Sequence, residues 1–155
     1  MTPPPAPIPA SARGWPATLR PALVGWVVLG GMAGTTLRDQ LGHMFPATPG
    51  GWPWTTFAIN VSGAFLLGLL LTALSASGPD EGARRAARLG VGTGVVGGYT
   101  TYSSFMVESV SLVGGGHGFV ALGYDAASLV AGFAAAFAGT MLGALVGQLG
   151  TRGQP

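Results

Sequence analysis

Hydroxyl, aromatic and acidic side chains follow a glycine pair in the middle of the chain. The segment from residue 89 reads LGVGTGVVGGYTTYSSFMVESV. Thr and Ser hydroxyls both donate and accept hydrogen bonds, so such a cluster can bind an ion of either sign. We expect ion coordination rather than catalysis here, because no base, nucleophile and orienting group converge in the sequence. The four hydroxyl side chains of this cluster are Thr100, Thr101, Ser103 and Ser104.

The same segment is a poor α-helix near residues 97–101. Gly is less favourable than Ala in a helix by about 1 kcal/mol, and the hydroxyl residues that follow compete for backbone hydrogen bonds. We therefore predict a helix break there. At membrane depth, a break is tolerated where the freed backbone groups line a cavity or bind something. Free carbonyls suit a small hard cation, and the N-terminus of a half-helix attracts an anion; a purely structural kink is the alternative.

An amide and two aromatic rings are further candidates for an ion path. Asn60 lies in the apolar run TFAINVSGAF, where its amide must find a partner or water. An interhelical hydrogen bond and a pore-lining role are equally open for it. Tyr102 and Phe105 are three residues apart and so share a helical face. Their positive ring edges can meet an anion, although ordinary packing is the commoner role of such a pair.

One acid and two hydroxyls flank this group. Glu108 must be hydrogen-bonded, protonated or near water at this depth. We expect a hydrogen-bonded or interfacial carboxylate rather than one that couples to proton movement. Tyr124 and Ser128 are four residues apart, hence on one helical face, and can continue a polar track.

The elements that position these residues belong to a membrane protein. Of 155 residues, 48% are hydrophobic and 8% are charged, whereas a soluble domain carries about 25% charged residues. The chain has no Cys, and His43 and His117 lie far apart, which excludes a disulfide framework and a thiolate or histidine metal site. A net charge of +2 is too small and too scattered for a nucleic-acid surface.

The charged residues divide the chain into four stretches that can each cross a bilayer, which takes about 20 helical residues. Barrel strands would alternate polar and apolar residues, and the leucines of residues 66–71 do not. The predicted fold class is all-α, with four transmembrane helices of which the third is broken mid-membrane. We expect the helices at residues 21–37, 54–76, 89–113 and 126–149.

Three segments follow from this division. Residues 1–20 hold many of the 12 prolines and are predicted to be a disordered tail rather than a signal peptide. Residues 21–150 form the transmembrane domain, and residues 151–155 a C-terminal tail. Glycines that recur every four residues predict close helix packing, at residues 30 and 34, at residues 90, 94 and 98, and at residues 139, 143 and 147.

Three motifs resemble those of the bacterial fluoride channel family, Fluc, also called CrcB. They are GGMAGTTLRDQL in the first predicted helix, TFAINVSGAFLLG in the second and GVVGGYTTYSSFMVE in the third. The resemblance covers residues 25–148. It implies a passive, fluoride-selective channel in the cell membrane, built as an antiparallel dimer of four-helix subunits around a central sodium ion.

The resemblance also implies roles for individual residues. Gly97 and Thr100 would supply the sodium-binding backbone carbonyls of each subunit, and Arg38 would lie near a vestibule. The remaining residues would line the fluoride pore, with the amide of Asn60, the aromatic box of Tyr102 and Phe105, and a hydroxyl track of Thr101, Ser104, Tyr124 and Ser128.

Two features depart from the family pattern. Tyr102 stands where the family usually has Phe, and its hydroxyl can bond Asn60 or a pore water. The arginines are also unevenly distributed, which favours insertion with both tails in the cytoplasm. A homodimer and a heterodimer with an oppositely oriented homologue are therefore equally open. One side of the membrane would carry only Arg38, and the other side six arginines, namely Arg13, Arg20, Arg84, Arg85, Arg88 and Arg152.

Two other functional classes make different predictions. A small proton-coupled exporter of the multidrug type needs an acid within a span, and Glu108 is the only candidate in the predicted helices. Replacing Glu108 by Gln would abolish transport by an exporter and largely spare a passive channel. A structural subunit predicts no flux under any condition.

Overall fold

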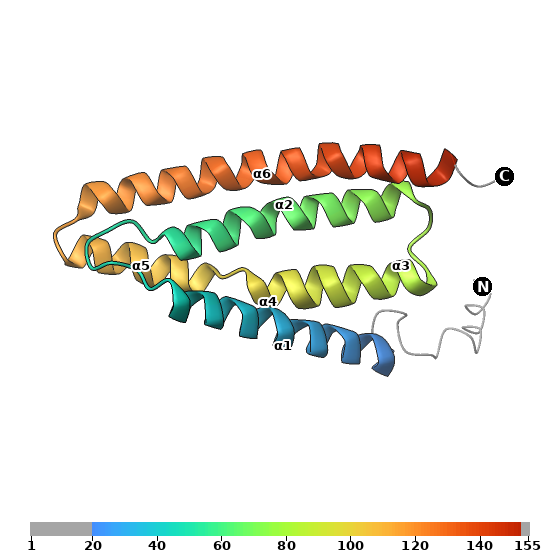
Figure 1. Ribbon diagram of the computed structural model, residues 1–155, viewed down its shortest axis with the longest axis horizontal. Coiled ribbons are helices and arrows are strands. Elements are labelled where there is room, and N and C mark those ends of the chain that lie inside the picture. Colours follow the sequence, from blue (N-terminus) through green and yellow to red (C-terminus); the bar gives the residue numbers. More distant parts are fainter. Residues whose placement is uncertain (1–19, 153–155) are drawn as a thin grey trace, which may run out of the picture.

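The chain is helical throughout the part that the structure describes. The computed structural model describes the backbone of residues 20–152 and the side chains of residues 20–148. Apart from Arg20, the predicted N-terminal tail lies outside the described residues. The elements share one long axis, with α2 beside α6 and α1 beside η3 and α4 (Figure 1). In chain order they are α1 (Pro21–Met44), α2 (Trp54–Ala76), α3 (Gly82–Ala87), η3 (Arg88–Val96), α4 (Gly97–Tyr99), α5 (Tyr102–Gly114) and α6 (Gly118–Arg152).

The first helix begins where the sequence predicts and ends later. α1 starts at Pro21, whose fixed φ suits the first helical position. The end predicted at Leu37 is wrong, because the helix continues to Met44. The charged residues after Leu37 are compatible with a helix and mark only the end of its apolar stretch. α1 ends at Met44 because the next residue, Phe45, precedes Pro46, and α-helical backbone is disfavoured before proline.

The second helix has the predicted bounds, whereas the last helix is longer than predicted. α6 begins at Gly118 instead of residue 126 and reaches Arg152, two residues into the predicted tail. Between the helices predicted at residues 89–113 and 126–149, only residues 115–117 lie outside a helix, and among them Gly116 has a φ of +81° that favours glycine. Among residues 20–148, α2 and α6 are the two helices long and apolar enough to cross a membrane.

The glycine repeats lie at two close helix contacts. A Cβ on Gly30 would overlap the carbonyl oxygen of Gly90, and one on Gly34 would overlap that of Val95, so α1 contacts η3 through bare backbone. Gly139 makes the same kind of contact between α6 and α2, at the carbonyl of Phe65. The predicted role of the glycines in helix packing is confirmed.

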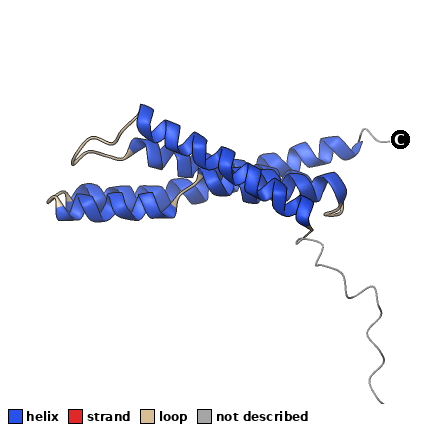
Figure 2. Ribbon diagram, turned by 90° about the horizontal axis from the view of Figure 1, so that it is seen from below, coloured by secondary structure: helices blue, strands red, loops and turns tan. Residues whose placement is uncertain are grey.

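The third predicted helix starts early and is broken where expected. Helical structure begins at Gly82 of α3 rather than at residue 89, so the arginines of this region lie on the helix. η3 is a wide π-helical segment whose following residue, Gly97, donates its N–H to the Gly92 carbonyl five residues back. Thr100 and Thr101 then take extended conformations, with ψ of 157° and 126°. Figure 2 shows loop backbone there, between two helical parts.

Candidate functional site

A side-chain amide on α2 clamps the break. Thr101 N–H donates to Asn60 Oδ1 over 2.9 Å, and Asn60 Nδ2 donates to the Thr101 carbonyl over 2.9 Å. In a continuous α-helix Thr101 N–H would bond the Gly97 carbonyl, and the amide of Asn60 takes its place. Asn60 therefore makes the interhelical hydrogen bond that the sequence left open, and keeps one amide hydrogen for another acceptor.

The two threonines build the break from both sides. Thr100 donates both its N–H and its hydroxyl to the Val96 carbonyl, each over 3.0 Å, and these bonds end α4. The Thr101 hydroxyl accepts from Ser104 N–H over 3.1 Å and so caps the first turn of α5. Thr101 is buried, at 7% exposure. The local sequence thus stops one helix and starts the next within two residues.

The carbonyls around the break are the candidate cation ligands. Gly97 and Thr100, the predicted pair, line a cavity of about 540 Å³. Thr35 donates to the Gly98 carbonyl over 3.4 Å, and Arg38 makes a long 3.5 Å contact with the Thr100 carbonyl. Oxygen ligands suit a hard cation such as sodium. Two carbonyls are too few to coordinate it alone, so the donor set fits sodium only if a second chain contributes.

Most of the predicted pore residues line one cavity of about 460 Å³. Tyr102 is 75% exposed, and its ring centre lies 6.2 Å from that of Phe105, as expected for neighbours on one helical face. Within the described residues, the buried Ser128 hydroxyl has no hydrogen-bond partner. Besides the carbonyl residues Gly97 and Thr100, the predicted pore residues in this cavity are Asn60, Thr101, Tyr102, Phe105 and Ser128.

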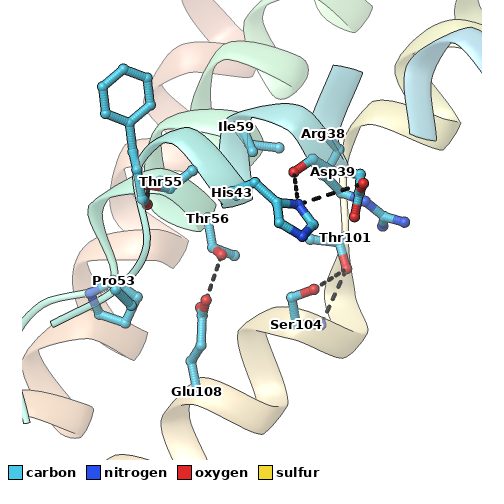
Figure 3. A pocket seen from close by; sticks show the side chains of 13 residues that line it. Arg38, Asp39, His43, Pro53, Thr55, Thr56, Ile59, Thr101, Ser104 and Glu108 are labelled. Carbon is cyan, nitrogen blue, oxygen red and sulfur yellow. Dashed lines mark hydrogen bonds and ion pairs between the residues drawn. The ribbon is translucent and has the colours of Figure 1, made fainter. Parts of the chain in front are cut away.

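Glu108 lies in a hydrogen-bonded cluster, and Figure 3 shows its bond to Thr56. Thr56 on α2 donates to Glu108 Oε1 over 2.6 Å, and Tyr124 on α6 donates to Oε2 over 2.8 Å. Tyr124 is fully buried, and its ring centre is 5.0 Å from that of Phe105. The expectation of a hydrogen-bonded carboxylate is confirmed. Tyr124 consequently donates to an acid within the chain instead of lining the cavity.

A third cavity, of about 320 Å³ and more polar, is lined by Glu108. Figure 3 shows Arg38, Asp39 and His43 of α1 across this cavity from Glu108 and Ser104 of α5. His43 Nδ1 lies 3.5 Å from Asp39 Oδ2 at the exposed edge. This polar cavity shares Thr101 with the 460 Å³ cavity lined by Tyr102 and Phe105, which we call the aromatic cavity, so the two adjoin at the break. Arg38 and Ser104, the remaining predicted site residues, both lie here.

Comparison with known proteins identifies the family. The family described as CrcB-like protein, Camphor Resistance (CrcB), matches residues 25–140. The fluoride-specific ion channel FluC 1 of Cutibacterium acnes is 48% identical over 113 residues, which cover 73% of this chain and 79% of the relative. This chain belongs to the CrcB family. The FluC 2 channel of Leifsonia xyli is 48% identical, covering 78% of this chain and 83% of the relative, and the FluC channel of Thermus thermophilus is 45% identical, covering 78% and 95%.

Family membership and the two apolar helices make this CrcB-family chain a membrane protein. Besides Glu108, two acids lie within the helices although the predicted helices do not include them, Asp39 on α1 and Asp125 on α6. Asp125, expected in a connection, lies on α6 and accepts from the Ser109 hydroxyl over 2.9 Å, which corrects the inference that Glu108 is the only acid within the helices. No local pattern points to this pair, because the register between α5 and α6 is what brings Ser109 to Asp125.

Proposed function

We propose that this protein is a fluoride-selective channel of the cell membrane that lowers cytoplasmic fluoride by passive efflux. The relatives named as fluoride-specific ion channels support this function. The observation that carries it is the aromatic cavity, which gathers an amide, two aromatic rings and an unpartnered hydroxyl beside a helix break. Fluoride is small and strongly hydrated, so a pore must offer many donors in place of its water.

Three adjoining cavities support a path along the bundle. The polar cavity beside Arg38 shares Thr101 with the aromatic cavity. The aromatic cavity in turn shares Asn60, Gly97 and Thr100 with the cavity of about 540 Å³, which η3 also lines. An anion moving along this series would pass the break in the middle, where it needs hydrogen-bond donors most because water is excluded.

Four membrane-spanning segments and an antiparallel partner complete the proposal. The spans are α1, α2, the broken stretch from η3 to α5, and α6. The exposure of Tyr102 supports a partner, because one chain leaves this side of the cavity open. Sodium is proposed on the carbonyls of Gly97 and Thr100 from both chains, where its charge would offset an anion at low dielectric. The partner is either a second copy or an oppositely oriented homologue.

Fluoride efflux from liposomes that contain the purified chain tests the function, with chloride as the control anion. Asn60→Asp turns the free amide donor into a negative oxygen, and Phe105→Leu removes the ring edge. We expect Asn60→Asp to lower fluoride efflux about tenfold or more, since one lost charge-assisted hydrogen bond costs on the order of 1.5–3 kcal/mol. Phe105→Leu should also lower efflux, because the positive ring edge that meets the anion is lost. Phe137→Leu is the matched control, because Phe137 is exposed on α6 and lines no cavity of the path. Efflux that survives both pore changes would refute the assignment.

A further inference from the structure

Arg88 lies at the end of the proposed path that is remote from Arg38. It is the first residue of η3, and it lines the cavity of about 540 Å³ together with Asn60, Gly97 and Thr100. The other described residues around this cavity are apolar or uncharged, so Arg88 is its one charged group. α3 and the start of α1 occupy this end of the bundle (Figure 1).

A carboxylate of the same chain already occupies the Arg88 guanidinium. Arg88 Nε donates to Asp80 Oδ1 over 3.0 Å, and Arg88 Nη2 donates to Oδ2 over 2.8 Å. Two parallel bonds of this kind are the strongest arrangement that arginine makes with an anion. The hydrogen bond from Arg88 holds the pKa of Asp80 below its ordinary value, so Asp80 is ionised at neutral pH. A second arginine, Arg85, places its Nε 3.6 Å from Asp80 Oδ2.

The two partners are held differently. Arg88 belongs to a helix, whereas Asp80 lies in the short connection between α2 and α3. Both side chains are partly exposed, at 34% for Arg88 and 47% for Asp80, so water and small ions reach the pair. Asp80 is in effect a tethered anion on the one cationic group of this cavity. A mobile anion leaving the cavity would have to compete with it.

We propose that Arg88 is an anion-binding mouth of the channel and that Asp80 is its built-in competitor. This inference rests on the proposed fluoride conduction. Conduction requires that each site bind its ion well enough to admit it and weakly enough to release it. By taking two of the five N–H donors of Arg88 and balancing its charge, Asp80 weakens the hold of this mouth on fluoride and keeps the residence of fluoride short.

The inference predicts a distinctive change in the kinetics of efflux. In Asp80→Asn the amide cannot balance the guanidinium charge, so fluoride binds Arg88 more tightly and leaves more slowly. The half-saturating fluoride concentration should fall about threefold or more, within the range that a single local charge exerts on counter-ion concentration. The maximal rate should fall or stay unchanged. A nonspecific gain in surface charge would instead raise the rate at low salt and leave saturation unaltered.

The test measures fluoride efflux from liposomes as a function of fluoride concentration. Glu81→Gln is the matched control, because it removes the same charge from the adjacent acid, which makes no ion pair within the described residues. Arg88→Gln should raise the half-saturating concentration, and Asp80→Asn should have no further effect in that background. Arg88→Lys, which keeps the charge without the bidentate geometry, should give an intermediate value.

The outcomes separate this inference from the function on which it rests. If the wild type conducts fluoride and Asp80→Asn has the same half-saturating concentration as Glu81→Gln, the competitor role of Asp80 is refuted while the channel function stands. An effect of Asp80→Asn that persists in Arg88→Gln overturns the role of Arg88. No fluoride efflux from the wild type, either alone or together with an oppositely oriented homologue, overturns both proposals. Size-exclusion profiles of every variant in detergent exclude misfolding as the cause of a change.

Discussion

At the scale of single residues, Asn60 and Glu108 show how the site meets the demands of low dielectric. Asn60 donates to and accepts from the backbone of Thr101, so its amide replaces the helical hydrogen bond that the break removes. Glu108 accepts from Thr56 and Tyr124, which come from two different helices. Both side chains thus have hydrogen-bond partners on neighbouring helical segments, as burial favours.

Replacing Glu108 by Gln distinguishes a channel from a proton-coupled exporter. Hydroxyls can donate or accept, so Thr56 and Tyr124 can adjust to the amide, and we expect fluoride efflux to fall by less than about tenfold, or about 1.4 kcal/mol. Efflux is measured with and without an imposed pH gradient. Complete loss in Glu108→Gln together with full activity in Glu108→Asp would contradict the channel, because it would show that the carboxyl proton is required.

The sequence identified most of these residues but not their partners. The type and depth of Glu108 were enough to predict a hydrogen-bonded acid, because an intramembrane carboxylate has few alternatives. Thr56 and Ser109 were not predicted as partners, since threonine and serine are common in helices and only the register of the packed helices brings them to an acid. Asp125 was missed because the start of α6 was placed eight residues too late, at residue 126 instead of Gly118.

At the scale of elements, the position of the break could be predicted from local sequence, whereas the lengths of α1 and α6 could not. The glycine pair and two threonines predicted the position of the break, because their backbone preferences act within a few residues. The ends of α1 and α6 were misplaced, since charged residues and glycines were taken as helix ends although both helices continue through them. The π-helical form of η3, which packs against α1, was not predicted from the sequence.

The contact between α1 and η3 can be tested at one glycine. In Gly34→Ala the new Cβ would overlap the Val95 carbonyl, so α1 must shift, and we expect a loss of about 1–3 kcal/mol of stability, typical of overpacking. Thermal unfolding in detergent measures it. Gly31→Ala is the matched control, because its Cβ meets nothing within 4 Å and alanine favours the helix. Equal stability of the two variants would mean that the close contact contributes nothing.

At the scale of the whole molecule, the proposed second chain raises the question of orientation. The arginines of α3 lie on a helix and hold the connection before it, with Arg84 donating to the Ser77 carbonyl over 3.0 Å. The pairing of Arg85 and Arg88 with Asp80 leaves the orientation rule in force, because that rule counts arginine and lysine and gives acids little weight. The chain therefore carries a strong bias towards one orientation, which an antiparallel homodimer would have to overcome.

Orientation reporters fused to the C-terminus decide between the two kinds of dimer. A fluorescent protein that folds only in the cytoplasm and a phosphatase active only outside it are fused in separate strains. The six-to-one distribution of arginines places the C-terminus in the cytoplasm and so predicts strong fluorescence. The phosphatase activity should be low, on the order of a tenth or less of that of a dual-topology control. A homodimer predicts comparable signals from both reporters, because half of its chains insert in each direction. A one-sided signal with fluoride efflux restored only by an oppositely oriented homologue supports the heterodimer, whereas two-sided signals and efflux from the chain alone exclude it.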